Sequence, residues 1–176
     1  PDGSRVTFLR NRKDDYERYD LWEYHIGDGR TRRLVDSELI APGDEALSDE
    51  EKARRERQRI FGRGIMEYAW AEDSRSLLFP LAGDVYRYDL AAKEVARLTR
   101  TAVFETDVRS SPDGRYVSFI RDQDIYAVDL RSGRSFFSVE DPRYWEKTPF
   151  RDIIGWDAGD WRVIVHYHCF HKNAGH

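Results

Sequence analysis

Cysteine is nearly absent from this chain, and that absence excludes a fold held together by disulfides. The single residue, Cys169, leaves no internal disulfide framework. No apolar run approaches the roughly 20 residues that cross a bilayer as a helix, so no membrane span is predicted in this segment. Charge of one sign is also lacking, because 29 basic and 33 acidic residues are scattered along the chain and leave a net charge of −4. Such a balance gives no field that would attract nucleic acid or an anionic membrane.

The sequence also lacks a nucleophile motif. Hydrolases of the α/β fold place the reactive serine in a G-x-S-x-G turn, and no such string occurs here. The nearest glycine-serine string, "RSGRSFF", is typical of a hairpin turn. A Ser-His-Asp set built from Ser111 and the tail histidines has nothing in the sequence to orient it. We therefore predict no catalytic residue and a segment that is inactive by itself.

The tail "HYHCFHKNAGH" is the stretch best suited to hold a metal ion. His166 and His168 would share one face of a strand, and Cys169 and His171 could add ligands. No partner of the CxxC or HxxxH kind lies upstream, although a metal site needs a rigid frame around its ligands. An unstructured tail is the favoured interpretation, and we predict neither a metal nor a cofactor.

A repeat dominates what the sequence does contain. "SSPDGRYVSFIRDQDIYAVDL" (residues 110–130) aligns with "WAEDSRSLLFPLAGDVYRYDL" (residues 70–90) at a shift of 40, which pairs Phe79 with Phe119. The opening "PDGSRVTF" matches "PDGRYVSF", and "DLWEYHIGDGRTRRLV" matches "DVYRYDLAAKEVARLT" at a shift of 64. The chain therefore holds three copies of one unit, with an insertion of 64 − 40 = 24 residues between the first two.

Each copy has the pattern of a short antiparallel meander. A Pro-Asp-Gly or Asp-Ser turn leads into a β-branched and aromatic strand, and a second turn leads into an alternating strand. A unit of four short strands repeated every 40 residues is typical of β-propeller blades, and a β-sandwich with chance similarity is the alternative. We predict an all-β fold, namely a partial β-propeller of about three to four four-stranded blades with one inserted surface helix.

The copies divide the chain into predicted segments. These are an incomplete first blade (1–36), a helical insertion and connection (37–69), a second blade (70–109), a third blade (110–139) and a divergent tail that could begin a fourth blade (140–176). In successive blades, Phe79 and Phe119 should fill like positions between neighbouring sheets. An arc of blades exposes one unpaired face at each end, so we expect it to associate. The chain opens within a repeat and without methionine, and we expect it to be a piece of a longer protein.

The insertion at residues 37–60 carries a helix signal. Ser48 and Glu51 make a capping box, which predicts a helix from about Asp49 to Arg59. Acidic residues offset the five basic residues between Lys52 and Arg59, so the helix is polar almost all round. We predict a solvated helix on the rim and an insertion that leaves the stack of sheets altogether. Contact with a specific ligand or with nucleic acid are the alternatives.

Several of these stretches together resemble one family. "DLWEY", "LSDEEKARRERQRI", "YAWAEDSRSLLFPLAGDVYRYDL" and "FETDVRSSPDGRYVSFIRDQDIYAVDL" are similar to the N-terminal β-propeller of bacterial dipeptidyl peptidase IV enzymes, in the prolyl oligopeptidase clan. TolB-like proteins share the blade motif, so the helical insertion is the discriminating part. The resemblance implies a serine exopeptidase in which the propeller gates and positions peptide substrate for a C-terminal α/β-hydrolase domain. That hydrolase removes dipeptides that carry proline or alanine second.

The resemblance also implies site residues. An arginine of an Arg-Ile pair approaches a substrate carbonyl in the family, and "QRI" before Trp70 places Arg59 there, with Arg63 as a neighbour of similar reach. A solvated or salt-bridged arginine is the alternative for both. The family's pair of glutamates, which binds the peptide ammonium, has no match here, because Glu140 and Glu146 are six residues apart in a divergent tail.

Two functions therefore stay open. The first is the propeller segment of a dipeptidyl peptidase IV-like enzyme, and the second is a non-enzymatic TolB-like propeller that binds a protein partner. The resemblance implies as partners the hydrolase domain of the same parent chain, the peptide substrate and a second copy of the parent in a homodimer. It leaves a periplasmic or a cytoplasmic location of the parent open.

Overall fold

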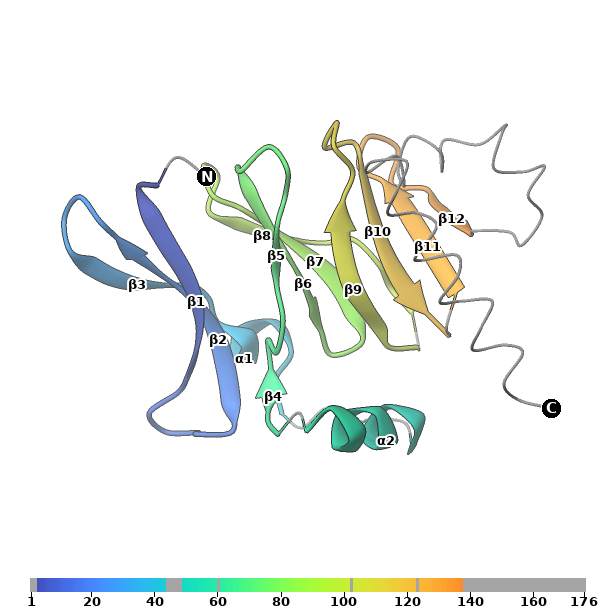
Figure 1. Ribbon diagram of the computed structural model, residues 1–176, viewed down its shortest axis with the longest axis horizontal. Helices are drawn as coiled ribbons and strands as arrows, with labels where there is room; N and C mark the ends of the chain where they lie inside the picture. Colours follow the sequence, from blue (N-terminus) through green and yellow to red (C-terminus); the bar gives the residue numbers. More distant parts are fainter. Residues whose placement is uncertain (1–2, 44–48, 60, 102, 123, 138–176) are drawn as a thin grey trace.

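Three four-stranded sheets stand side by side in the computed structural model, which describes residues 3–43, 49–59, 61–101, 103–122 and 124–137 (Figure 1). Sheet A holds β1 (Arg5–Asn11), β2 (Arg18–His25), β3 (Arg30–Val35) and β4 (Arg63–Gly64); sheet B holds β5 (Ala69–Trp70), β6 (Ser76–Leu81), β7 (Asp84–Asp89) and β8 (Glu94–Arg97); sheet C holds β9 (Glu105–Ser110), β10 (Tyr116–Arg121), β11 (Asp124–Asp129) and β12 (Ser135–Phe137). The helices α1 (Ser37–Ile40) and α2 (Asp49–Gln58) follow β3 in the chain. The prediction of an all-β fold, a partial β-propeller with one inserted surface helix, is confirmed.

Sheets B and C are antiparallel meanders with the same register. Phe79 pairs with Tyr86 across β6 and β7, and Phe119 pairs with Tyr126 across β10 and β11. The rings stack in both sheets, with centroids 5.8 Å and 5.9 Å apart and interplanar angles of 10° and 9°. The shift of 40 in the sequence is therefore a structural equivalence, down to one pair of aromatic rings.

The two cores confirm the predicted places of Phe79 and Phe119. Phe79 lies between sheets A and B, in a buried cluster with Leu21 and Val35 of sheet A. Phe119 lies between sheets B and C, in a buried cluster with Leu78 of sheet B. Burying a phenylalanine side chain contributes about 1.5–3 kcal/mol, so this repeated position is one source of the cohesion between neighbouring sheets.

Sheet A departs from the meander. Its fourth strand, β4, comes from beyond the insertion and runs parallel to the start of β2, where Arg63 N–H donates to the Glu17 carbonyl at 2.7 Å. Gly64 makes this approach possible, because a Cβ there would lie 2.5 Å from the Tyr19 carbonyl oxygen and its φ is +81°. The insertion is thus closed at its base by a two-residue strand.

The predicted helix is present as α2, outside the three sheets and near β4 and the start of β9 (Figure 1). The predicted capping box lies outside the residues whose side chains are described. The prediction that the insertion leaves the stack altogether is wrong at its start. Ser37 is fully buried, and Ile40 and Ala41 pack against the core between sheets A and B. The cause is Asp20, whose Oδ1 accepts 2.8 Å hydrogen bonds from both N–H and Oγ of Ser37 and holds α1 against β2.

Candidate functional site

Helix α2 is attached to the sheets through Arg55. Its Nη1 donates to the Gly62 carbonyl at 3.2 Å, and its guanidinium carbon lies 6.0 Å from the ring centroid of Phe104, just before β9. A cleft of about 50 Å³ opens beside this contact and is lined in part by Leu81 and Thr106. This cleft is too small for a peptide. What matters here is the pair of Arg55 contacts, which hold α2 beside the ends of sheets B and C.

Arg59 ends this helix. Its backbone takes the left-handed conformation, with φ at +54°, and its N–H donates to the Glu56 carbonyl at 3.1 Å. The side chain is exposed, and no hydrogen bond or ion pair of its guanidinium is found within the described part of the chain. Arg59 is therefore an accessible cation on the α2 side of the molecule.

Arg63 is in a different situation. It is half-buried in β4, and its Nη2 and Nε lie 2.8 Å and 3.3 Å from Oδ2 of Asp15. The Arg63 guanidinium lowers the pKa of the Asp15 carboxyl from its ordinary value. The two sequence candidates are therefore one accessible arginine and one arginine held in an ion pair.

A pocket of about 390 Å³ lies beside Arg63. The residues that line it carry three positive and three negative charges: Arg12, Asp14, Asp15, Arg18, Glu38, Gly43 and Arg63. Its base is Arg18, which is 1% exposed and donates to the carbonyls of Ala41 and Gly43. Arg18 Nε also lies 2.8 Å from Glu38 Oε2, off the N–H direction, so this contact is an ion pair. The positive and negative charges balance one another. We interpret the pocket as the place where the insertion is attached to sheet A, and we call it the root of the insertion.

Sequence reasoning missed Arg18 and also a repeated side-chain set. Asp20 binds Arg33 and Ser37 in sheet A, while Asp84 binds Arg97 and the Thr101 N–H in sheet B. Both sets align at the shift of 64 that aligns the first two copies. The sequence therefore contained a signal for this set, namely the recurrence of its residues at the repeat shift. In each sheet the aspartate lies near the start of one strand and its arginine partner near the end of the next strand. Nothing in the sequence distinguished Arg18 from an exposed arginine.

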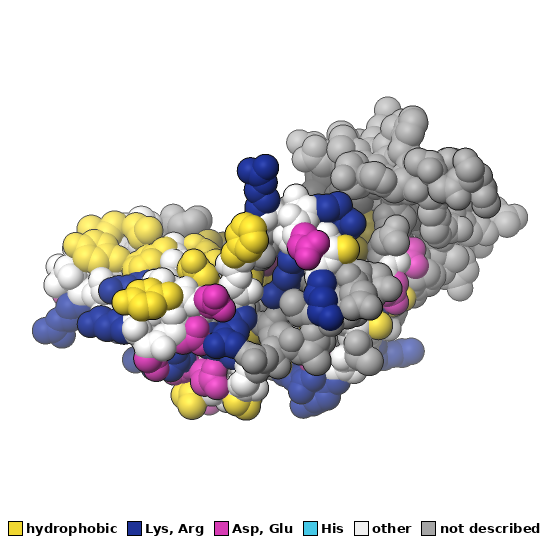
Figure 2. Space-filling model, turned by 90° about the horizontal axis from the view of Figure 1, so that it is seen from below, with side chains coloured by type: hydrophobic (Ala, Val, Ile, Leu, Met, Phe, Trp, Pro, Cys, Tyr) yellow, Lys and Arg dark blue, Asp and Glu magenta, His cyan; other side chains and the backbone are white. Residues whose placement is uncertain are grey.

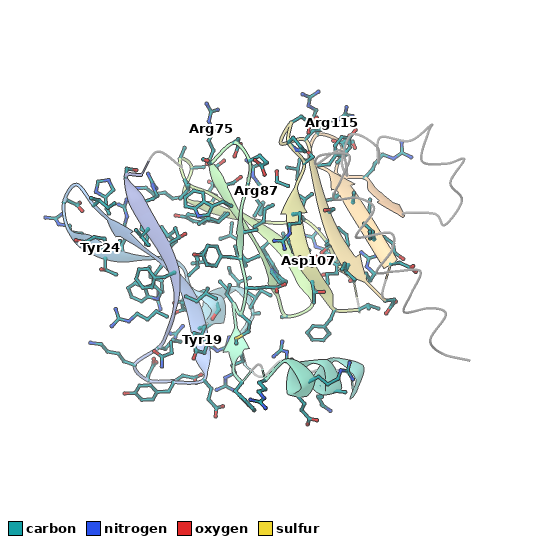
Figure 3. All side chains as sticks on the ribbon, viewed as in Figure 1. Tyr19, Tyr24, Arg75, Arg87, Asp107 and Arg115 are labelled. Atoms are coloured by element: carbon teal, nitrogen blue, oxygen red, sulfur yellow. The ribbon has the colours of Figure 1, made fainter. Side chains whose placement is uncertain are left out.

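Two acidic residues at the same repeat position link neighbouring sheets. Glu67 and Asp107 are 40 apart, and Glu67 Oε1 accepts a 3.1 Å hydrogen bond from the Asp107 N–H. Asp107 takes a φ of +52° on the edge strand β9, where Figure 3 labels it, and its carboxylate lies 2.7 Å from Arg109. This edge of sheet C therefore presents both signs of charge.

The described residues contain no group of three or more His, Cys, Asp or Glu side chains that could hold a metal ion. The tail histidines, Cys169, Glu140 and Glu146 lie outside those residues. Across the same ranges, no helix has the length and apolar character to cross a membrane.

Comparison with protein families gives the family of this chain. The sequence model described as "Dipeptidyl peptidase IV (DPP IV) N-terminal region" matches residues 67–156, just over half of the 176 residues. The chain belongs to this family. The match covers sheets B and C, where the repeat is most regular.

Solved structures similar to this member of the dipeptidyl peptidase IV N-terminal family are also propellers. TolB from Acinetobacter baumannii is 16% identical with a TM-score of 0.52, over 78% of this chain and 30% of that chain. A putative TolB from Agrobacterium tumefaciens is 18% identical with a TM-score of 0.52, over 78% and 46%. Porphyromonas gingivalis dipeptidyl peptidase 4 is 19% identical with a TM-score of 0.48, over 80% and 18%. At these identities the TolB likeness shows the fold, and the chain spans less than half the length of each of these structures.

Proposed function

We propose that this chain is the part of a dipeptidyl peptidase IV-like serine exopeptidase that gates and positions peptide substrate. In this proposal the chemistry takes place on a C-terminal α/β-hydrolase domain of the same parent protein. The observation that carries the proposal is the family match over residues 67–156. The position of α2 beside the ends of sheets B and C supports it, because a helix fixed there can narrow the approach to a propeller from one side (Figure 1).

Arg59 is the residue we assign to the substrate carbonyl. A guanidinium donates several hydrogen bonds in a planar fork and keeps its charge at any physiological pH. Arg59 is exposed at the end of α2, whereas the guanidinium of Arg63 already donates two hydrogen bonds to the carboxylate of Asp15. Arg63 is therefore the second choice, since a substrate would have to displace the Asp15 carboxylate.

The alternative is a non-enzymatic, TolB-like propeller that binds a protein partner. The structural likeness to TolB is a likeness of fold, at 16% and 18% identity. The family match covers more than half of this chain and favours the peptidase assignment.

A binding experiment on the 176-residue chain tests the substrate role of Arg59. A peptide with Gly-Pro at its free N-terminus and a fluorophore at its C-terminus should bind saturably in an anisotropy titration. Arg59→Ala should weaken binding tenfold or more, because a hydrogen bond from a charged group contributes about 1.5–3 kcal/mol. Arg75→Ala is the matched control, since Arg75 is exposed at the opposite end of sheet B from α2 (Figure 3). Equal weakening by both substitutions, or no binding at all, would contradict the assignment.

The same preparation tests the missing chemistry. The chain alone should not hydrolyse a chromogenic Gly-Pro substrate, because it contains no G-x-S-x-G nucleophile turn. Turnover that survives repurification and is abolished by a serine-directed inhibitor would show that the chain carries its own nucleophile.

A further inference from the structure

A second arginine of α2 closes the turn that carries Arg59. Arg55 lies four residues before Arg59, and its Nη1 donates to the carbonyl of Gly62, three residues after Arg59, at 3.2 Å. This hydrogen bond therefore spans Arg59 and joins the last turns of the helix to the chain that leaves it. Arg59 itself has a φ of +54°, which is costly for a residue with a side chain, so the turn needs contacts that hold it.

The first partner of Arg55, Gly62, is fixed against sheet A. The N–H of the next residue, Arg63, donates to the Glu17 carbonyl at 2.7 Å. A Cβ at Gly62 would lie 2.8 Å from that carbonyl oxygen, and the φ of Gly62 is +133°, so only glycine lets the chain pass this close to the start of β2. The Gly62 carbonyl is therefore a fixed acceptor for Arg55.

The second partner, Phe104, is fixed against sheets B and C. Its neighbour Glu105 is 1% exposed, donates its N–H to the Gly83 carbonyl at 3.0 Å and accepts a 2.9 Å hydrogen bond from Arg121 Nε. A Cβ at Gly83 would lie 4.0 Å from Cγ of Phe104, so the β6–β7 turn packs against this ring. The Arg55 guanidinium carbon, 6.0 Å from the ring centroid, is therefore in contact with a rigid part of the molecule.

The composition of α2 makes these two contacts important. Among residues 49–58 only Ala53 is apolar, so burial of an apolar face cannot hold this helix against the sheets. Figure 2 shows acidic and basic side chains close together on the side of the molecule that carries α2. A helix of this kind depends on specific side-chain contacts for its position.

We propose that Arg55 is a positioning residue, which holds the turn at the end of α2 so that Arg59 meets the peptide in one orientation. The inference rests on the proposed function, because it gives Arg55 a role in the substrate contact of Arg59. Arg55 is half-buried between Gly62 and Phe104, whereas Arg59 is exposed, so Arg55 acts through Arg59 and does not itself bind the peptide. A turn that is held before the peptide arrives avoids the loss of conformational freedom on binding.

Peptide binding to the 176-residue chain tests the proposal, with the same fluorescent Gly-Pro peptide and anisotropy titration as for Arg59. Arg55→Met keeps the apolar stem and removes both contacts, and it should weaken binding about fivefold. Arg57→Met is the matched control, since it removes the same charge from an exposed position of the same helix. This control should bind the peptide as the unaltered chain does.

A double substitution distinguishes positioning from a general effect on the fold. If Arg55 acts through Arg59, adding Arg55→Met to Arg59→Ala should weaken binding by less than about twofold further, because the residue that Arg55 positions is already gone. A full further loss in that background would overturn the proposal, since Arg55 would then act independently of Arg59. Equal binding by Arg55→Met and Arg57→Met would overturn it too.

Hydrogen exchange separates these outcomes from a failure of the proposed function. The backbone amides of α2 should exchange about fivefold faster or more in Arg55→Met and at the original rate in Arg57→Met, with circular dichroism to show that both variants fold. Phe104→Leu should also speed exchange, whereas Phe104→Tyr keeps the aromatic ring and should not.

The unaltered chain decides between the two failures. If it does not bind the peptide, the proposed function is contradicted and with it the orientation of Arg59 towards a peptide. Exchange then tests the remaining part: faster exchange in Arg55→Met supports Arg55 as the residue that holds the turn, and unchanged exchange contradicts that role as well.

Discussion

Ser74 occupies the turn position at which the next copy of the repeat has Gly114. Both residues take the left-handed conformation, with φ at +54° and +68°, and their N–H groups make equivalent 2.9 Å hydrogen bonds to Ala71 and Ser111. A side chain makes this conformation costly, whereas glycine adopts it without strain. Ser74→Gly should therefore raise the free energy of unfolding by about 0.5–1 kcal/mol in urea titrations.

The reverse substitution is the control for this effect. A Cβ added at Gly114 meets no atom within 4 Å, so Gly114→Ser changes the backbone preference without a clash. It should lower the free energy of unfolding by a similar amount. If Ser74→Gly destabilises the protein, the hydroxyl of Ser74 contributes more than the strain costs.

Aromatic and charged residues differ in how far the sequence could predict their places. Phe79 and Phe119 recur at one spacing in alternating strands, and that pattern alone predicts their burial between sheets. Arg18 opens an alternating strand too, but its burial depends on the carbonyls of Ala41 and Gly43, which reach it only after the chain has turned through α1. Local sequence carries no signal for a contact that the tertiary fold creates.

At the scale of the element, Arg18 of β2 holds the start of the insertion in place through its contacts with Glu38, Ala41 and Gly43. Arg18→Met keeps the apolar stem but removes the donors to two carbonyls and leaves Glu38 without this ion pair. Because two partly buried hydrogen bonds from a charged donor are lost, the free energy of unfolding should fall by about 1–3 kcal/mol. Urea titration measures the loss, and limited proteolysis should cut the insertion faster. Arg57→Met, on the exposed side of α2, should change neither measurement.

The two helices of the insertion show why one could be predicted and the other could not. Helix α2 runs from Asp49 to Gln58, within one residue of the predicted end, because charge pattern and capping are local properties. Helix α1 has only four residues and no period to detect. Asp36 caps it by accepting from the N–H groups of Glu38 and Leu39, and Asp20 anchors Ser37. Its existence is a consequence of the packing of sheet A.

At the scale of the whole molecule, aspartates at equivalent turns of the three sheets make the stability of the fold depend on pH. Asp28 and Asp89 each accept backbone N–H groups at the hairpin turns that follow β2 and β7, and Asp129 does the same at the turn that follows β11. The Arg115 guanidinium, 2.8 Å away, and then the Arg131 N–H lower the pKa of the Asp129 carboxyl from 3.8 to about 2. Backbone N–H groups of Arg30 and of Ala92 lower the pKa of Asp28 and Asp89 in the same direction. Each sheet therefore carries a carboxylate that the folded state holds in its ionised form.

Lowered pKa values in the folded state make the stability sensitive to acid. An aspartate of this kind binds its proton more readily when the chain is unfolded, so its contribution is complete above the unfolded pKa of about 4 and is lost as the pH falls towards 2. Urea titrations should give a nearly constant free energy of unfolding down to about pH 5 and a steep decline below about pH 4. Asp129→Asn should lower the stability at neutral pH and make that decline shallower, because the Arg115 contact no longer depends on ionisation. Glu72→Gln, at an exposed position, should leave the decline as it is. A decline of unchanged steepness in Asp129→Asn would mean that the Arg115 contact does not link Asp129 to folding.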